Sequence, residues 1–147
     1  MKVVLDTNVI IDGVKDDYSY EKQIIDAIVT GKIEAFANHQ TLRENKLITR
    51  QLINSSAYAK EMNELFSRIQ MVENKHQIHI VEDSEDNKIL ESAVEAEADY
   101  LITRDNALLK IAKYEGVSIV TPAEFWNRYQ EDSNDLWQQW TNFFSGK

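Results

Sequence analysis

The sequence predicts an α/β protein in which a five-stranded parallel sheet has helices on both faces. Two observations support this prediction. Five short β-rich segments alternate with helical patterns, and the first of them, Val3-Val4-Leu5, has no polar residue between its apolar ones. A strand without polar alternation is typical of a parallel sheet that is buried on both faces. Strands separated by helices favour parallel order, because each helix returns the chain to the same edge of the sheet.

The expected strands cover residues 2–6, 32–37, 78–82, 100–103 and 117–120. The expected helices cover residues 19–30, 41–53, 57–75, 85–97 and 105–115, and a further short helix begins at Pro122. Capping residues support these boundaries: Gly31 and Gly116 follow two of the helices, and Asn54-Ser55-Ser56 separates two others. Proline is well suited to the first turn of a helix, where its missing N–H costs no hydrogen bond.

Composition places the chain among globular proteins. It has 147 residues, 43% of them hydrophobic, which is enough to bury one core, and no cysteine. The absence of cysteine excludes disulfides, thiolate metal sites and a thiol nucleophile. Because the N-terminus passes directly into a short strand, we expect neither a signal peptide nor a membrane span, and therefore a soluble cytoplasmic protein without a membrane partner.

The C-terminal segment differs from the rest of the chain, so we expect one domain at residues 1–129 and an extension at residues 130–147. After a polar stretch at residues 131–135, large apolar residues recur at positions i, i+1, i+4, i+7 and i+8, namely Leu136, Trp137, Trp140, Phe143 and Phe144. This spacing predicts an amphipathic helix with an aromatic stripe. Such a helix packs either on the domain or on a partner.

Four acids are expected at the edge of the sheet where the strands end. Asp6 ends the first strand, Glu44 lies in the first turn of the helix after the second strand, Asp86 opens the helix at residues 85–97, and Asp105 follows the fourth strand. Ligands of parallel sheets bind at this edge. Carboxylates suit Mg²⁺ or Mn²⁺, and such an ion can activate water and neutralise a phosphate, which is the equipment of phosphodiester hydrolysis.

Each acid also has a structural explanation when it is considered alone. Asp86 and Asp105 would stabilise the first turns of their helices, and Glu44 is one of 25 acids in the chain. Three neighbouring polar side chains could support the acids or a bound water, or could form local turns and caps. They are Thr7, Asn8 and Thr103.

Basic side chains near these acids are candidates for contacts with phosphate groups. They are Arg43, Lys46 and Arg50, at i, i+3 and i+7 on the helix that carries Glu44, and Arg104 beside Asp105. The alternative is a solvated helix face. The net charge of −9 opposes nonspecific binding of nucleic acid, although a cation at the acids would neutralise part of it.

Other catalytic classes fit the sequence less well. A phosphatase of the haloacid-dehalogenase type needs a second aspartate two residues after the first, where this chain has Asn8. With only four glycines, the chain has no glycine-rich phosphate loop, and no serine–histidine constellation is evident.

Three segments resemble the PIN-domain ribonucleases. They are Val4-Leu5-Asp6-Thr7-Asn8-Val9-Ile10, the block made by residues 86–93 and 98–105, and residues 116–125. The resemblance covers about residues 1–126 and implies a three-layer α/β/α, Rossmann-like fold. It also implies that Mg²⁺ or Mn²⁺ bound by Asp6, Glu44, Asp86 and Asp105 supports cleavage of single-stranded RNA, with Thr7, Asn8 and Thr103 in supporting positions.

The sequence is similar to the toxin group of that family, whose members act in bacterial toxin–antitoxin pairs. The resemblance therefore implies a small antitoxin protein as a partner and a homodimer. The alternative is a catalytically inactive PIN-like scaffold that binds RNA or a protein partner without cutting.

Overall fold

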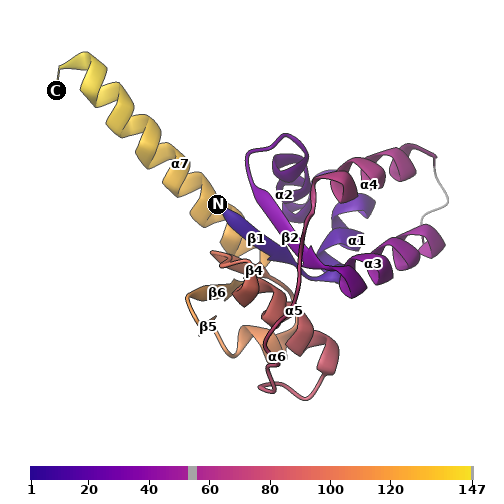
Figure 1. Ribbon diagram of the computed structural model, residues 1–147. Coiled ribbons are helices and arrows are strands. Elements are labelled where there is room, and N and C mark those ends of the chain that lie inside the picture. The colour runs from indigo at the N-terminus through magenta and orange to yellow at the C-terminus, as the bar shows by residue number, and fades with distance from the viewer. Residues whose placement is uncertain (53–55, 147) are drawn as a thin grey trace.

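The computed structural model describes residues 1–52 and 56–146, which form a six-stranded sheet between helices (Figure 1). The strand order is β3-β2-β1-β4-β6-β5. Five strands are parallel: β1 (Lys2–Leu5), β2 (Glu34–Asn38), β3 (Gln70–Val72), β4 (Tyr100–Ile102) and β6 (Val117–Val120). The α/β class is confirmed. The purely parallel five-stranded sheet is wrong, because β5 (Lys113–Tyr114) pairs antiparallel with β6 at one edge.

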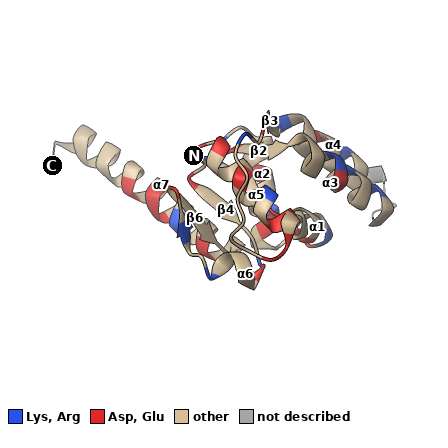
Figure 2. Cartoon of the chain, turned by 60° about the horizontal axis from the view of Figure 1, so that its bottom comes forward, with Lys and Arg blue, Asp and Glu red and all other residues tan. Residues whose placement is uncertain are grey.

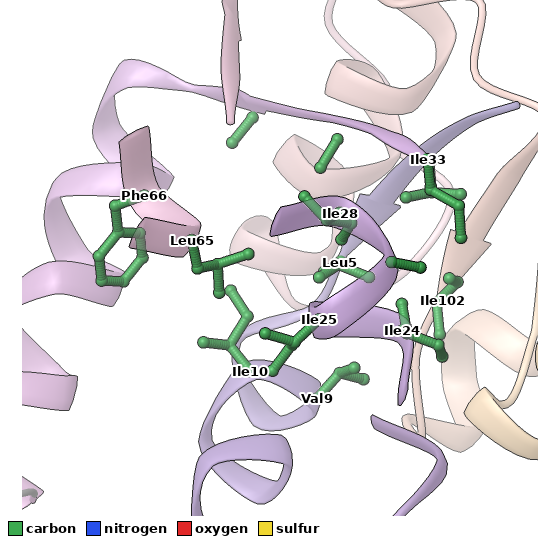
Figure 3. Packing of buried hydrophobic residues seen from close by; sticks show 14 of the residues in the cluster. Leu5, Val9, Ile10, Ile24, Ile25, Ile28, Ile33, Leu65, Phe66 and Ile102 are labelled. Atoms are coloured by element: carbon green, nitrogen blue, oxygen red, sulfur yellow. The ribbon is translucent and has the colours of Figure 1, made fainter. Parts of the chain in front are cut away.

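The helices are α1 (Thr7–Lys15), α2 (Tyr20–Val29), α3 (His39–Leu52), α4 (Ser56–Arg68), α5 (Ser84–Glu95), α6 (Asn106–Leu109) and α7 (Pro122–Ser145). Two separate apolar cores join them to the sheet. Val3 and Leu5 face a core shared with α1, α2, α4 and α7, whereas Val4 faces a core shared with α5 and α6. Figure 3 shows the first core, in which Leu5 lies among apolar side chains of α1, α2 and α4. The sheet is therefore covered on both faces, as the apolar first strand indicates.

The third strand of the structure is β3, at residues 70–72. The strand expected at residues 78–82 is therefore wrong. The sequence pattern placed residues 70–72 in a helix at 57–75, but α4 ends at Arg68. In the segment 78–82, the N–H of Ile78 donates to Oε1 of Glu91 at 2.6 Å, and the N–H groups of Ile80 and Val81 donate to Oδ1 of Asn87 at 3.1 Å. Because side chains of α5 satisfy these backbone groups, the segment needs no neighbouring strand.

Besides α4, one helix was not expected and two differ in length from the expectation. The sequence reading omitted α1, which Asp6 caps and which buries Val9, Ile10 and Val14. The helix expected at residues 105–115 ends at Leu109; a positive φ angle at Ala112 then precedes β5, and one at Glu115 lies in the turn from β5 to β6. The helix that begins at Pro122 is long and extends to Ser145.

The expected extension is part of α7, which crosses residue 129 without a break and projects away from the sheet (Figure 1). Its aromatic side chains from Trp137 onward are exposed, so the alternative in which they pack on their own domain is not what the structure contains. No helix within residues 1–52 and 56–146 combines the length and apolar character that crossing a membrane requires.

Close packing of α1 on α2 depends on Gly13. A Cβ atom added there would overlap Cδ1 of Ile25 and lie 3.1 Å from the backbone carbonyl carbon of Glu21. Ile25 is fully buried, so its side chain has little room to move. This contact fixes the position of α1, whose first residues adjoin Asp6.

We expect Gly13→Val to lower the free energy of unfolding by about 2–3 kcal/mol, because overpacking forces the two helices apart. Chemical denaturation monitored by circular dichroism measures the change. Lys15→Val, on an exposed position of the same helix, is the matched control and should cost about 0.5 kcal/mol. Equal costs for the two variants would contradict the packing argument.

Candidate active site

Asp6 is fixed at the carboxyl end of β1. Its backbone N–H donates to the carbonyl oxygen of Ile102 on β4 at 3.0 Å. Its carboxylate is buried, with Oδ1 accepting from the N–H of Thr7 at 2.7 Å and Oδ2 accepting from Oγ1 of Thr103 at 2.8 Å. Asp6 is thus both the N-cap of α1 and a carboxylate held at the end of the sheet.

Thr103 connects two of the predicted acids. Its fully buried hydroxyl donates to Asp6 and accepts the backbone N–H of Asp105 at 3.0 Å. Asp105 in turn caps α6, where its Oδ1 accepts the N–H of Ala107 at 2.8 Å. The ends of β1 and β4 therefore bring Asp6 and Asp105 to the same edge of the sheet.

Asp86 lies in the first turn of α5 and is buried. Asp83 caps that helix, with Oδ1 accepting the N–H of Glu85 at 2.8 Å. Figure 2 shows the acidic start of α5. The sequence reading placed Asp86 at this edge but did not include Asp83 among the site residues.

The acids at this edge of the sheet affect the protonation of Asp6 and Asp86. The pKa of Asp86 is raised to about 6, first by burial and then by the negative charges of Asp105, Asp83, Asp6 and Glu85, in that order. Burial likewise raises the pKa of Asp6, against the lowering effect of its hydrogen bonds from Thr103 and Thr7, and the charges of Asp105 and Asp83 add to the increase. The charges of Asp105 and Asp83 therefore disfavour the charged forms of Asp6 and Asp86.

The described residues supply no basic partner that would offset this repulsion. None of the ion pairs formed within residues 1–52 and 56–146 includes Asp6, Asp83, Asp86 or Asp105. Buried carboxylates without a paired base are costly, and a bound cation is a usual compensation.

Glu44 lies at the border of this cluster. Its Oε1 accepts from Nε2 of Gln40 at 3.3 Å, and Oε1 of Gln40 accepts from Nζ of Lys88 on α5 at 3.2 Å. The neighbouring Asn45 makes the closer link, because its buried Oδ1 accepts a hydrogen bond from Oγ1 of Thr7. The structure thus joins α3 to the site through Asn45, with Thr7 as its contact, while Asn8 is exposed.

The basic residues divide into two groups. Lys46 and Arg50 line a cavity of about 420 Å³ between α3 and α4, where Nζ of Lys46 lies 5.8 Å from the centre of the Phe66 ring. Arg43 lines an adjoining cavity together with Lys46. Arg104 instead forms ion pairs with Asp12, at 3.1 Å, and with the buried Glu21.

The donor set suits a hard divalent cation, since it consists of carboxylates and hydroxyls that no base neutralises. Within the described ranges, no three acidic or histidine side chains are drawn together closely enough to form a metal site as they stand. Asp6, Asp86 and Asp105 are the residues that could hold an ion, because they share the edge of the sheet and influence one another's charge.

Asn45 and Asp83 are the site residues that sequence reasoning missed. Asn45 has a signal in retrospect: Thr41, Asn45 and Thr49 recur every four residues and all are buried, so α3 turns a polar row inward. Asp83 has a weaker signal, because an acid before Ser84 is typical of an ordinary helix N-cap.

A three-layer α/β/α fold with clustered carboxylates at the carboxyl edge of its sheet defines a class of proteins equipped to bind divalent cations there. The family model described as the PIN domain matches residues 2–107, which is more than half of the chain. The chain therefore belongs to the PIN-domain family. Comparisons with curated proteins and with solved structures gave no match.

PIN domains are typically nucleases, which are hydrolases, and they generally use divalent metals. Membership also suggests RNA binding. The matched residues include all four predicted acids and end before α7.

The raised pKa of Asp86 generates a prediction about stability and pH. Folding raises this pKa from the ordinary 3.8 to about 6, so the folded protein binds the proton more tightly than the unfolded chain. The stabilisation that protonation gives is complete below about pH 4 and is lost as the pH rises through about 6. At neutral pH the charged Asp86 therefore destabilises the metal-free protein.

We expect Asp86→Asn to raise the melting temperature of the metal-free protein by a few degrees at pH 7.5 and to leave it unchanged at pH 4. Differential scanning calorimetry in EDTA at both pH values measures this. Asp17→Asn makes the same charge change at an exposed position and should have little effect at either pH. A lower melting temperature for Asp86→Asn at pH 7.5 would refute the argument.

Proposed function

We propose that this protein is a metal-dependent endoribonuclease that cleaves phosphodiester bonds of single-stranded RNA. The observation that supports it most is the set of carboxylates at the ends of β1 and β4 and the start of α5, which form no ion pair with a base within residues 1–52 and 56–146. Family membership supports the same proposal, because PIN domains are typically nucleases.

In this proposal Asp6, Asp86, Asp105 and Glu44 would hold Mg²⁺ or Mn²⁺, and the charge of Asp83, which acts on both Asp6 and Asp86, would add to the attraction for the ion. The ion, when bound, would supply charge neutralisation at the phosphate and a more acidic water. The residues of the chain position this chemistry. Thr103 holds Asp6 in place, and the bond from Thr7 to Asn45 fixes the start of α1 against α3.

The RNA backbone would pass along α3, which carries basic residues (Figure 2) and, with α4, lines a cavity at Lys46 and Arg50. Arg43, Lys46 and Arg50 are the proposed phosphate contacts, since their side chains occupy one face of that helix. Arg104 is a weaker candidate because its guanidinium is engaged with Asp12 and Glu21.

We expect the purified protein to cleave a labelled, unstructured RNA in Mn²⁺, and EDTA to abolish the cleavage. Asp6→Asn and Asp105→Asn should each reduce the rate by at least about 100-fold, because removing a ligand impairs both metal binding and water activation. Asp17→Asn is the matched control and should retain full activity. Circular dichroism verifies that each variant is folded.

Thermal melting with Mn²⁺ separates this proposal from a scaffold that binds without cutting. A competent site raises the melting temperature of the wild type by mass action, and Asp6→Asn abolishes the shift. A wild type with neither cleavage nor a Mn²⁺ shift would contradict the enzyme proposal and favour the scaffold.

We further propose that the ribonuclease is the toxin of a bacterial toxin–antitoxin pair in the cytoplasm, on the basis of the resemblance of residues 86–105 and 116–125 to that group. Induced expression in a bacterial host should then arrest growth, whereas Asp6→Asn should not. Normal growth at an expression level at which the enzyme is active in the cell extract would contradict the toxin role.

A further inference from the structure

The distal part of α7 presents a large apolar surface to solvent. The first turns of the helix pack on α2 and β4, with Phe125 fully buried. From residue 136 onward the large side chains are between 55% and 78% exposed, namely Leu136, Trp137, Trp140, Phe143 and Phe144. Apolar patches of this size on a soluble protein mark a surface that another molecule covers.

The exposed side chains already form one ordered patch. The rings of Trp137 and Trp140 are stacked with centroids 5.4 Å apart, and Phe144 lies 4.5 Å from Trp140 and 5.3 Å from Phe143. These side chains already pack against one another and are therefore partly ordered. Covering them with a partner costs less side-chain conformational entropy than covering side chains that do not touch each other.

The spacing of the patch has an internal symmetry. Leu136, Trp137, Phe143 and Phe144 lie at four and three residues on either side of Trp140. In an antiparallel pair of helices centred on Trp140, Leu136 of one copy faces Phe144 of the other, and Trp137 faces Phe143. A twofold axis requires such self-complementarity, in which two copies use the same surface.

The charges on α7 favour the same arrangement. Acids occur at Glu131, Asp132 and Asp135, whereas residues 136–146 contain no charged residue. Figure 2 shows this uncharged distal half beyond the acidic turns. An antiparallel pair centred on Trp140 places Asp135 opposite Ser145 of the other helix and keeps the acids of the two copies at opposite ends of the pair, whereas a parallel pair would bring six acids together.

The area of the patch is sufficient for a dimer. Four aromatic side chains and one leucine, each more than half exposed, present roughly 500–700 Å². Two copies that face each other would remove roughly 1,000–1,400 Å² from water, which reaches the range of specific interfaces.

We propose that residues 136–144 of α7 are a dimerisation surface, on which two copies of the chain pack antiparallel about a twofold axis at Trp140. The proposal does not depend on the nuclease activity, because α7 lies outside the residues that match the PIN-domain model.

The test uses sedimentation equilibrium of the full-length chain over a range of concentrations. The wild type should be a dimer, and Trp140→Glu should weaken dimerisation by at least about 100-fold, because it places two carboxylates at the axis and removes both central indoles. Gln138→Glu adds the same charge on the opposite face of α7 and should dimerise as the wild type does. Unchanged melting of Trp140→Glu at a concentration where both proteins are monomeric would verify that the domain is folded.

The absence of native cysteine allows a second test, of orientation. Under mild oxidation, a mixture of Leu136→Cys and Phe144→Cys chains should form a crosslinked dimer, whereas Leu136→Cys alone should not crosslink to itself. Crosslinking of Leu136→Cys with itself would indicate parallel helices and overturn the proposed geometry.

Two further results would overturn the proposal. One is a wild type that is monomeric at every concentration. The other is a dimer that Trp140→Glu does not weaken. Flotation with phosphatidylcholine vesicles tests whether the patch binds a lipid surface instead of a second copy. Binding to vesicles by a monomer, lost in Trp140→Glu, would assign the patch to lipid.

Discussion

The burial of carboxylates at one edge of the sheet, made more costly by their mutual repulsion, is the constraint around which this protein is organised. The chain buries Asp6 and Asp86 at one edge of the sheet and adds Asp83 and Asp105 nearby, so that the pKa values of both buried acids rise. Hydrogen bonds from Thr103 and Thr7 offset only part of this cost for Asp6. Apolar cores on both faces of the sheet hold the acids together despite the repulsion. In the proposed function, a divalent cation bound there would relieve this repulsion, so that metal binding would also stabilise the fold.

Helix capping and site formation use the same side chains. Asp6, Asp83 and Asp105 each accept a backbone N–H at the start of a helix through one carboxylate oxygen. The cap fixes the orientation of the carboxylate, and because the three helices begin at the same edge of the sheet, the fixed carboxylates converge. The two explanations of these acids are therefore compatible. The hydrogen bond of the cap would fix the orientation of the carboxylate before a cation binds.

The sequence predicted the strands and helices that a local pattern of residues determines. It did not predict the features that depend on contacts between residues far apart in the chain. The apolar run from Val3 to Leu5 identified a central strand. Asp6, Asp86 and Asp105 were predicted at one edge of the sheet because each lies just after a recognisable strand or in the first turn of a recognisable helix. The segment 78–82 has a strand-like composition, but side chains of Glu91 and Asn87 satisfy its backbone, and no local pattern reveals that. Asn45 was missed for the same reason, since its partner Thr7 is 38 residues away. The antiparallel β5 lies between positive φ angles at Ala112 and Glu115. Alanine and glutamate rarely adopt positive φ, so the sequence does not predict these turns.

Direct location of the ion tests the central claim most directly. Crystals of the wild type grown with Mn²⁺, with diffraction recorded for the anomalous signal of manganese, give its position independently of any activity. The account predicts a peak within coordination distance of the carboxylates of Asp6, Asp86 and Asp105, about 2.0–2.4 Å from their oxygens. A peak elsewhere, or none at saturating Mn²⁺, would mean that these acids serve only as helix caps and that their repulsion has no compensating cation.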